Sequence, residues 1–331
     1  MLRRALIALG ASVLVVLLLV TGGTWYLTNR YAGNLDRVED VFAGLDESQR
    51  PTPAVTGPAG EAPLTFLVVG SDTRADVPAG ETPDGRSDVM MLVRFTGDRQ
   101  QAQVISLPRD SWVSIPGRGP AKLNAAYAYG GPSLLVQTVE GLTGTRIDHY
   151  AALDFAGFVE MTDALGGVDV QVAETTSNGP YTYAAGLNHL DGDQALYYVR
   201  QRHGLPGGDF DRVKRQQQYL RSVFTAASHQ NVLTDVGALD SFLRALTGAM
   251  SVDEELSSTA LLDMAVQLRS LRPAAVTFLT VPVAGTGMER AQSVVRLDGA
   301  RAELMWGYLQ DDVLGAHAGE FTDDMLVAVP N

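Results

Sequence analysis

The sequence predicts an α/β fold, specifically an α/β/α sandwich with a central mixed sheet, preceded by one N-terminal transmembrane helix. Apolar, β-rich runs at residues 64–69, 89–95 and 103–107 indicate strands that are buried on both faces. Amphipathic helical patterns then alternate with further strand-like runs. Buried strands interspersed with helices favour layers of helices around one sheet.

Helical spacing and capping signals place the later elements. The Asp191 and Gln194 pair forms a capping box for a short helix, and Asp209 or Asp211 can cap the helix that follows. The remaining predicted elements are helices at 133–142, 155–165, 239–250, 257–271 and 301–309, and strands at 168–170 and 275–281.

The composition excludes several classes of protein. The chain has 331 residues, 46% of them hydrophobic, which is enough to bury a full core. Cysteine is absent, so thiol catalysis, disulfides and cysteine-type zinc sites are excluded. The formal net charge of −13 argues against binding to nucleic acid, where affinity depends on many Lys and Arg contacts to phosphate.

The N-terminus predicts a membrane anchor within residues 1–29. Arg3 and Arg4 precede an uncharged stretch, residues 5–29, which Trp25 and Tyr26 close as interfacial anchors. A span needs about 20 apolar residues, whereas a cleavable signal peptide has roughly 7 to 15 and a small-residue cleavage site. We find no Ala-x-Ala site here. The positive-inside rule therefore places the rest of the chain outside the cytoplasmic membrane.

Residues 30–63 are expected to form a juxtamembrane segment and a linker rich in Pro and Gly. The folded extracytoplasmic domain is then expected at 64–331, within the upper size range for one domain.

A cluster of cations interrupts the acidic chain between Tyr198 and Leu220. Local positive charge in an acidic protein indicates an anionic ligand, and arginine suits bidentate phosphate recognition. The alternative is a solvated helix face. Arg200 and Arg202 are expected in extended chain, pointing the same way. One helix face is expected to carry Arg212, Arg215, Gln216 and Tyr219.

Further polar residues flank the predicted strands. Asp72 follows the first strand and Asp88 precedes the second, so chain geometry can bring two carboxylates to one sheet edge, as Mg²⁺ prefers. The alternative is that both residues are caps or turn formers. Arg109 follows the third strand as another candidate phosphate contact, or as the partner of Asp110 in a surface ion pair.

Standard nucleophilic machinery is missing from the sequence. There is no Gly-x-Ser-x-Gly elbow, no phosphate-binding loop ending in Gly-Lys-Ser/Thr, and no His-Glu-x-x-His motif. The five histidines are dispersed, and His203 within the arginine cluster is as well explained by packing as by a role as base. Acid–base or metal-assisted chemistry on phosphate fits these residues better than a serine triad.

Six segments in order resemble the LytR-CpsA-Psr family of cell-wall glycopolymer ligases. They are residues 67–74, 86–91, 105–112, 122–132, 163–168 and 200–218. The resemblance implies a phosphotransferase that moves a glycan phosphate from a polyprenyl-pyrophosphate carrier onto a peptidoglycan hydroxyl, releasing polyprenyl phosphate. The lipid is expected in a hydrophobic groove.

The resemblance also implies roles for individual residues. Asp72 and Asp88 would hold Mg²⁺, with Mn²⁺ as an alternative. Asp209 would orient the arginines or reach the metal shell. The pyrophosphate contacts implied are Arg86, Arg109, Arg200, Arg202, Arg212 and Gln216, and the implied catalytic set is Asp72, Asp88, Arg109, Arg202 and Arg212. The resemblance leaves two alternatives for the general base. Either Asp72 or Asp88 takes the proton from the acceptor hydroxyl, or the metal and the substrate phosphate suffice.

The sequence leaves the glycopolymer open among arabinogalactan, teichoic acid and a capsule. Lys122 and Lys214 are the only lysines, and this Arg-rich composition indicates a GC-rich genome, as in actinobacteria. The alternatives are a non-catalytic polyprenyl-pyrophosphate binding module, a pyrophosphatase and a transcriptional attenuator. An acidic domain outside the cell disfavours the attenuator.

Overall fold

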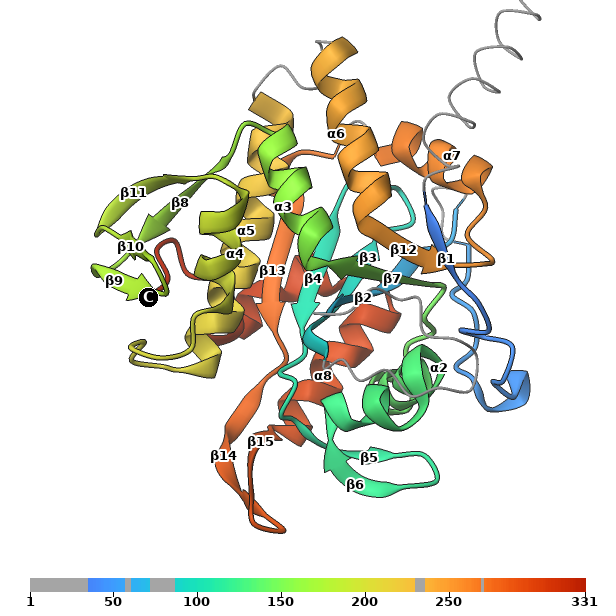
Figure 1. Cartoon of the computed structure of the whole chain (residues 1–331). Helices are drawn as coiled ribbons and strands as arrows, with labels where there is room; N and C mark the ends of the chain where they lie inside the picture. Colours follow the sequence, from blue (N-terminus) through green and yellow to red (C-terminus); the bar gives the residue numbers. More distant parts are fainter. Residues whose placement is uncertain (1–34, 57–60, 72–86, 230–235, 269–270) are drawn as a thin grey trace, which may run out of the picture.

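The computed structural model describes residues 35–56, 61–71, 87–229, 236–268 and 271–331. Its centre is a seven-stranded sheet in the order β1-β12-β7-β2-β3-β4-β13 (Figure 1). The strands are β1 (Asp36–Val38), β2 (Leu64–Ser71), β3 (Ser87–Phe95), β4 (Ala102–Ser106), β7 (His149–Asp154), β12 (Met250–Asp253) and β13 (Val276–Thr280). Parallel and antiparallel pairs both occur, so the predicted α/β fold with a central mixed sheet is confirmed.

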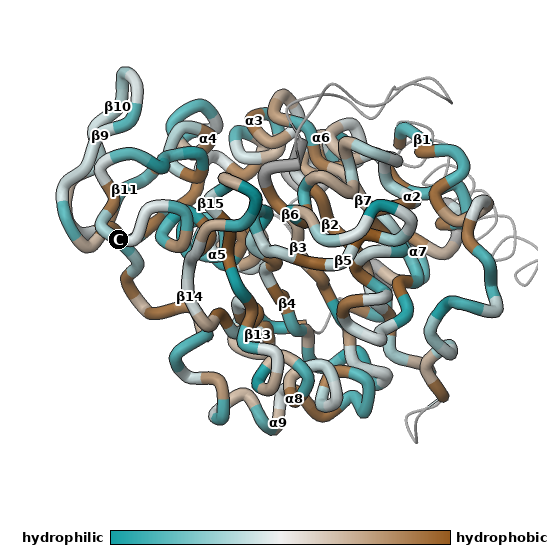
Figure 2. Tube along the Cα trace, turned by 90° about the horizontal axis from the view of Figure 1, so that it is seen from below, coloured by the Kyte–Doolittle hydropathy of each residue, from teal (hydrophilic) through white to brown (hydrophobic). Residues whose placement is uncertain are grey.

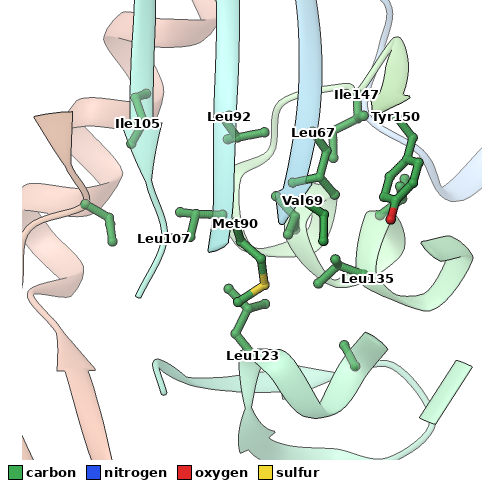
Figure 3. Packing of buried hydrophobic residues seen from close by; sticks show 14 of the residues in the cluster. Leu67, Val69, Met90, Leu92, Ile105, Leu107, Leu123, Leu135, Ile147 and Tyr150 are labelled. Carbon is green, nitrogen blue, oxygen red and sulfur yellow. The ribbon is translucent and has the colours of Figure 1, made fainter. Parts of the chain in front are cut away.

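One face of the sheet packs against α2 (Leu123–Thr143) and α8 (Gly299–Gln310). Alternate residues of β2 and β3, namely Leu67, Val69, Met90 and Leu92, point to this face, as the two-residue period of a strand requires (Figure 3). They share one buried cluster with Leu135 of α2. This side of the sheet forms the main apolar core.

The opposite face is covered by a second set of helices. They are α3 (Phe155–Ala164), α4 (Gly192–Arg200), α5 (Asp209–His229), α6 (Val236–Ala249) and α7 (Ser258–Leu268). The intervening strand residues Phe66 and Met91 form another buried cluster, against which Leu220 of α5 packs. In Figure 2, hydrophobic stretches mark the central strands β3 and β4. Both faces are therefore apolar, as the continuous hydrophobic runs predict.

Local signals explain where several helices begin. The Asp154 carboxylate accepts a hydrogen bond of 2.7 Å from the Gly157 amide at the start of α3. The capping box predicted for Asp191 and Gln194 is present at the start of α4. Two short C-terminal elements, α9 (Leu314–His317) and a 3₁₀ segment (Ala318–Asp324), follow α8.

Four two-stranded sheets lie outside the central one. They are β5 (Trp112–Ile115) with β6 (Gly119–Lys122), β8 (Val168–Val172) with β11 (Gly186–Leu190), β9 (Thr176–Asn178) with β10 (Tyr181–Tyr183), and β14 (Val283–Glu289) with β15 (Gln292–Leu297), all among the described residues. The β5–β6 and β14–β15 hairpins project from one end of the molecule (Figure 1). The strand predicted at 168–170 thus pairs with β11 and stands apart from the central sheet.

The folded unit extends N-terminally beyond Leu64, where the sequence places its start. β1 joins the sheet edge beside β12, and Val41 and Phe42 are buried in the main core. Residues 36–42 of the expected juxtamembrane segment therefore pack against the rest of the fold. The predicted anchor at 1–29 lies outside the described residues, and none of the helices described has the length and apolarity to cross a membrane.

Candidate functional site

A cavity of about 240 Å³ lies between the central sheet and helices α3, α4 and α5. Its walls are mostly apolar. The apolar lining consists of Val68, Val69, Gly70, Val89, Met91, Leu153, Phe155, Phe158, Leu196, Val199, Tyr219 and Leu220. Such a wall suits a hydrocarbon ligand, because burying apolar surface is favourable and leaves no polar group unpaired.

Two aromatic rings fix the helical side of this wall. Phe158 of α3 and Tyr219 of α5 stack with ring centroids 4.3 Å apart. The Tyr219 hydroxyl lies 2.6 Å from Thr162 Oγ1, so its polar end is satisfied. Burial raises the pKa of Tyr219, which keeps the phenol neutral beside the apolar space.

The same cavity is also lined by polar residues from the arginine cluster: Arg200, Arg202, Arg212 and Gln216. Arg202 Nε lies 3.3 Å from Asp209 Oδ1, and Arg212 Nη2 lies 2.8 Å from the same oxygen. One carboxylate therefore aligns two guanidiniums at the cavity. The structure thus places Asp209 between two of the expected pyrophosphate contacts, Arg202 and Arg212.

The two aligned arginines differ in exposure. The Arg212 side chain is 3% exposed, whereas that of Arg202 is 44% exposed. Gln216, one turn after Arg212 on α5, is buried, and its Nε2 lies 3.4 Å from the Val199 carbonyl oxygen. The cavity thus joins an apolar interior to a cationic region that can accept an anionic head group.

Arg215 departs from the expected arrangement. It does not line the cavity with Arg212 and Gln216, because it is fully buried on another side of α5. Its Nη1 donates to Gln201 Oε1 at 2.7 Å, and its guanidinium lies over the Tyr198 ring. Residues three apart on a helix differ by about 60° in direction, which is enough here to place them in different environments.

Arg109 follows β4 at the sheet edge where β2 ends and β3 begins. It is not part of the cavity lining. Its side chain is 11% exposed, with Nε 4.0 Å from Asp110 Oδ2, while Lys122 Nζ approaches Asp110 more closely, at 3.0 Å. The structure therefore places Arg109 near this edge without bringing it to the cavity wall.

The residues expected to bind a metal flank the ends of β2 and β3 in the sequence. Asp72 and Arg86 lie outside the described residues, and of Asp88 only the backbone in β3 is described. Ser71 pairs with Ser87 across a register shift in the β2–β3 ladder. Asp88 directly follows Ser87, so its backbone lies in the irregular part of this ladder, close to the end of β2. Among the residues the structure covers, no cluster of three or more potential ligands forms a metal site.

Asp154 lines the cavity, although its sequence context does not single it out as a site residue. It ends β7, pairs in register with Ser71 and lines the cavity while capping α3. The signal in the sequence is an aspartate between an apolar run and the helical pattern at 155–165. Helix capping explains such an aspartate fully, so only the strand register reveals its place beside the site.

The sequence matches the LytR_cpsA_psr family over residues 39–311. It is 32% identical over 329 residues to the cell wall biosynthesis protein LcpA of Corynebacterium glutamicum, covering 86% of this chain and 61% of LcpA. It is 34% identical over 221 residues to the polyisoprenyl-teichoic acid–peptidoglycan teichoic acid transferase TagU of Bacillus cereus (strain AH820), covering 66% of this chain and 71% of TagU.

The fold is also similar to that of a solved relative. The crystal structure of B. subtilis TagV superposes with a TM-score of 0.65 at 24% identity, covering 76% of this chain and 97% of TagV. This likeness includes the α/β architecture described above. Since the family match spans most of the sequence, the chain belongs to the LytR-CpsA-Psr family.

Proposed function

We propose that this protein transfers a glycopolymer phosphate from a polyprenyl-pyrophosphate carrier to a hydroxyl of peptidoglycan. The observation that carries the proposal is the cavity, which combines an apolar wall with Arg200, Arg202 and Arg212. A ligand that satisfies both parts has a hydrocarbon chain and a strongly anionic head. A polyprenyl pyrophosphate has that chemistry.

The apolar wall and the arginines of the cavity would each contribute to the binding free energy of such a ligand. Each methylene group moved from water into the apolar region contributes about 0.8 kcal/mol. Each hydrogen bond from a guanidinium to the pyrophosphate contributes about 1.5 to 3 kcal/mol. The buried Arg212 and Gln216 are fixed before the ligand arrives, so little further ordering is needed there.

The proposed reaction is a substitution at phosphorus. The acceptor hydroxyl oxygen forms a bond to the phosphorus that carries the glycan, while the bond from that phosphorus to the bridging oxygen breaks. The bridging oxygen leaves with polyprenyl phosphate, and the hydroxyl proton is lost as the new phosphodiester forms. Guanidiniums aligned by Asp209 would neutralise charge on the leaving phosphate.

Magnesium is part of the proposal, with Asp72 and Asp88 as its ligands and Mn²⁺ as an alternative ion. The support is the chemistry of the two carboxylates and the Ser71–Ser87 register that precedes them. When bound, the ion supplies charge neutralisation at the phosphate oxygens. The proton of the acceptor hydroxyl would pass either to one of these aspartates or to a phosphate oxygen of the substrate.

The proposed location is the outer surface of the cytoplasmic membrane, with the chain anchored through residues 1–29. The support is the uncharged stretch at 5–29 with Arg3 and Arg4 before it. A lipid carrier and a cell-wall acceptor would meet there. The name of TagU describes a teichoic acid transferase, which favours catalysis over binding alone.

The test uses the full chain in detergent with Mg²⁺, a polyprenyl-pyrophosphate glycan and peptidoglycan oligomers. Mass spectrometry should detect a phosphodiester-linked product and an equal amount of polyprenyl phosphate. Tight lipid binding without product, alongside an active relative assayed in the same way, would identify a binding module. Release of the glycan phosphate to water would identify a pyrophosphatase. Either result overturns the transferase proposal.

A further inference from the structure

We infer that Gln201 and Arg215 are positioning residues that hold Arg200 and Arg202 toward the cavity, an inference that rests on the proposed function. Gln201 lies between the two arginines in the sequence. It is 1% exposed, while both neighbours are exposed and line the cavity. A buried amide between two exposed cations indicates that contacts in the protein interior hold this segment in place.

The backbone explains this alternation. Gln201 caps the C-terminus of α4 with an extended conformation (φ −61°, ψ 132°). Because Gln201 is extended, its side chain points to the side opposite to those of its two neighbours: Gln201 is buried, whereas Arg200 at the end of α4 and Arg202 line the cavity. Fixing the Gln201 side chain therefore fixes the direction of both arginines.

The Gln201 amide has a partner at each end. Its Oε1 accepts from Arg215 Nη1 at 2.7 Å. Its Nε2 donates to Thr176 Oγ1 at 2.6 Å and to the His203 carbonyl oxygen at 3.0 Å. The last bond spans Arg202 from residue 201 to residue 203, so it restrains the backbone that carries this arginine.

Arg215 is in turn anchored independently of Gln201. Its Nε donates to the Asn331 carbonyl oxygen at 2.7 Å, and its Cζ lies 4.4 Å from the centroid of the Tyr198 ring. The side chain is fully buried, so it has little freedom to move. Arg215 thus connects the arginine segment to α5, α4 and the C-terminal residues.

The consequence is preorganisation of the anion site. Ordering a long, mobile side chain on binding weakens affinity by about two- to tenfold for each side chain. If Arg200 and Arg202 are directed before binding, most of this loss is avoided. Removing the Gln201 amide should therefore weaken binding of the pyrophosphate head group without removing either cation.

The experiment measures the affinity of the full chain for geranylgeranyl pyrophosphate, together with hydrogen exchange at residues 201–208. Gln201→Ala should raise Kd about tenfold and speed exchange in that segment, with exchange in α5 unchanged. Arg215→Lys keeps the positive charge but cannot span both of its oxygen partners, so it should have the same effects.

Gln218→Ala is the matched control. Gln218 is equally buried on α5, where it accepts from the Tyr198 hydroxyl at 2.6 Å and donates to the Gln171 carbonyl oxygen at 2.8 Å, without contacting the arginine segment. It should bind the ligand as the wild type does. Unchanged exchange at 201–208 in Gln201→Ala, or equal weakening in the control, overturns the inference. If the wild type fails to bind the lipid, the proposed function fails, and the exchange data still decide the positioning role.

Discussion

The guanidinium of Arg200 lies over the ring of Phe155, with its Cζ 4.4 Å from the ring centroid. Arg200 ends α4 and Phe155 begins α3, so the contact joins two helices at the cavity. A cation over an aromatic face is stabilised without a carboxylate, which leaves its N–H groups available for an anion.

Phe155→Leu keeps the wall apolar but removes this cation–π contact. We expect affinity for a polyprenyl pyrophosphate to fall about two- to fivefold, measured by calorimetry. Phe224→Leu, at a partly exposed phenylalanine of α5 away from the cavity, should leave affinity unchanged. Equal affinity of Phe155→Leu and wild type would show that Arg200 does not depend on the ring.

Replacing the aligned cations should abolish most of the transfer reaction. Arg202→Ala and Arg212→Ala each remove a guanidinium that Asp209 directs at the cavity, so we expect kcat/KM to fall about 10- to 100-fold. Arg244→Ala removes an exposed arginine paired with Asp240 on α6 and should retain full activity. Normal transfer by both cavity variants would place the reaction elsewhere.

A bulkier residue in the apolar wall should lower the affinity for the lipid chain by occupying part of the cavity. Leu196→Trp places a large ring in the cavity and displaces about two methylene groups of ligand, which lowers affinity about tenfold. Affinity for inorganic pyrophosphate should not change, because the cations remain. Leu187→Trp, on exposed β11, is the control. A parallel loss for inorganic pyrophosphate would point to misfolding instead of exclusion.

The buried Tyr198 predicts a loss of stability at alkaline pH. Burial raises its pKa to about 12, from 10.0 for the free phenol. The unfolded chain releases the proton first, so this stabilisation is complete below pH 10 and is lost as pH rises toward 12. The free energy of unfolding should fall by about 1.4 kcal/mol more in wild type than in Tyr198→Phe between pH 8 and pH 11. Urea titrations at both pH values measure this; equal losses would contradict it.

Removing divalent cations tests the proposed metal. Treatment with EDTA should lower transfer at least tenfold, and Mg²⁺ or Mn²⁺ should restore it, since the ion would stabilise charge on the phosphate oxygens in the transition state by about 1.4 kcal/mol or more. Asp88→Asn should need a higher Mg²⁺ concentration for half-maximal rate, whereas Asp193→Asn, on the exposed side of α4, should not. Full activity in EDTA would remove the metal from the proposal.

Much of the sheet could be predicted because its strands are apolar on both faces. The runs at 64–69, 89–95 and 103–107 carry that signal and became β2, β3 and β4. The edge strand β1 has only three residues, two of them exposed, so its sequence carries too short a pattern to predict a strand. It became visible only through its pairing with β12 and the burial of Val41 and Phe42 behind it.

The sequence predicted only part of the arrangement of arginines around the cavity. Charge clustering identified Arg202 and Arg212, but charge alone did not separate them from Arg215, which turns into the interior. The direction of a helical side chain depends on which element packs against each side of the helix, and here β2, β3, β7 and α3 cover one side of the cavity while Tyr198 covers Arg215.

By itself, the sequence determined the fold class and the family and predicted an anionic ligand, because these depend on local periodicity, on charge and on motifs in order. Only the tertiary structure decided which cations share a cavity, and that an apolar space adjoins them. It also revealed Asp154 beside Ser71 and the inward-facing Gln201. The physical reason is that strand register and side-chain burial are set by contacts between segments far apart in the chain.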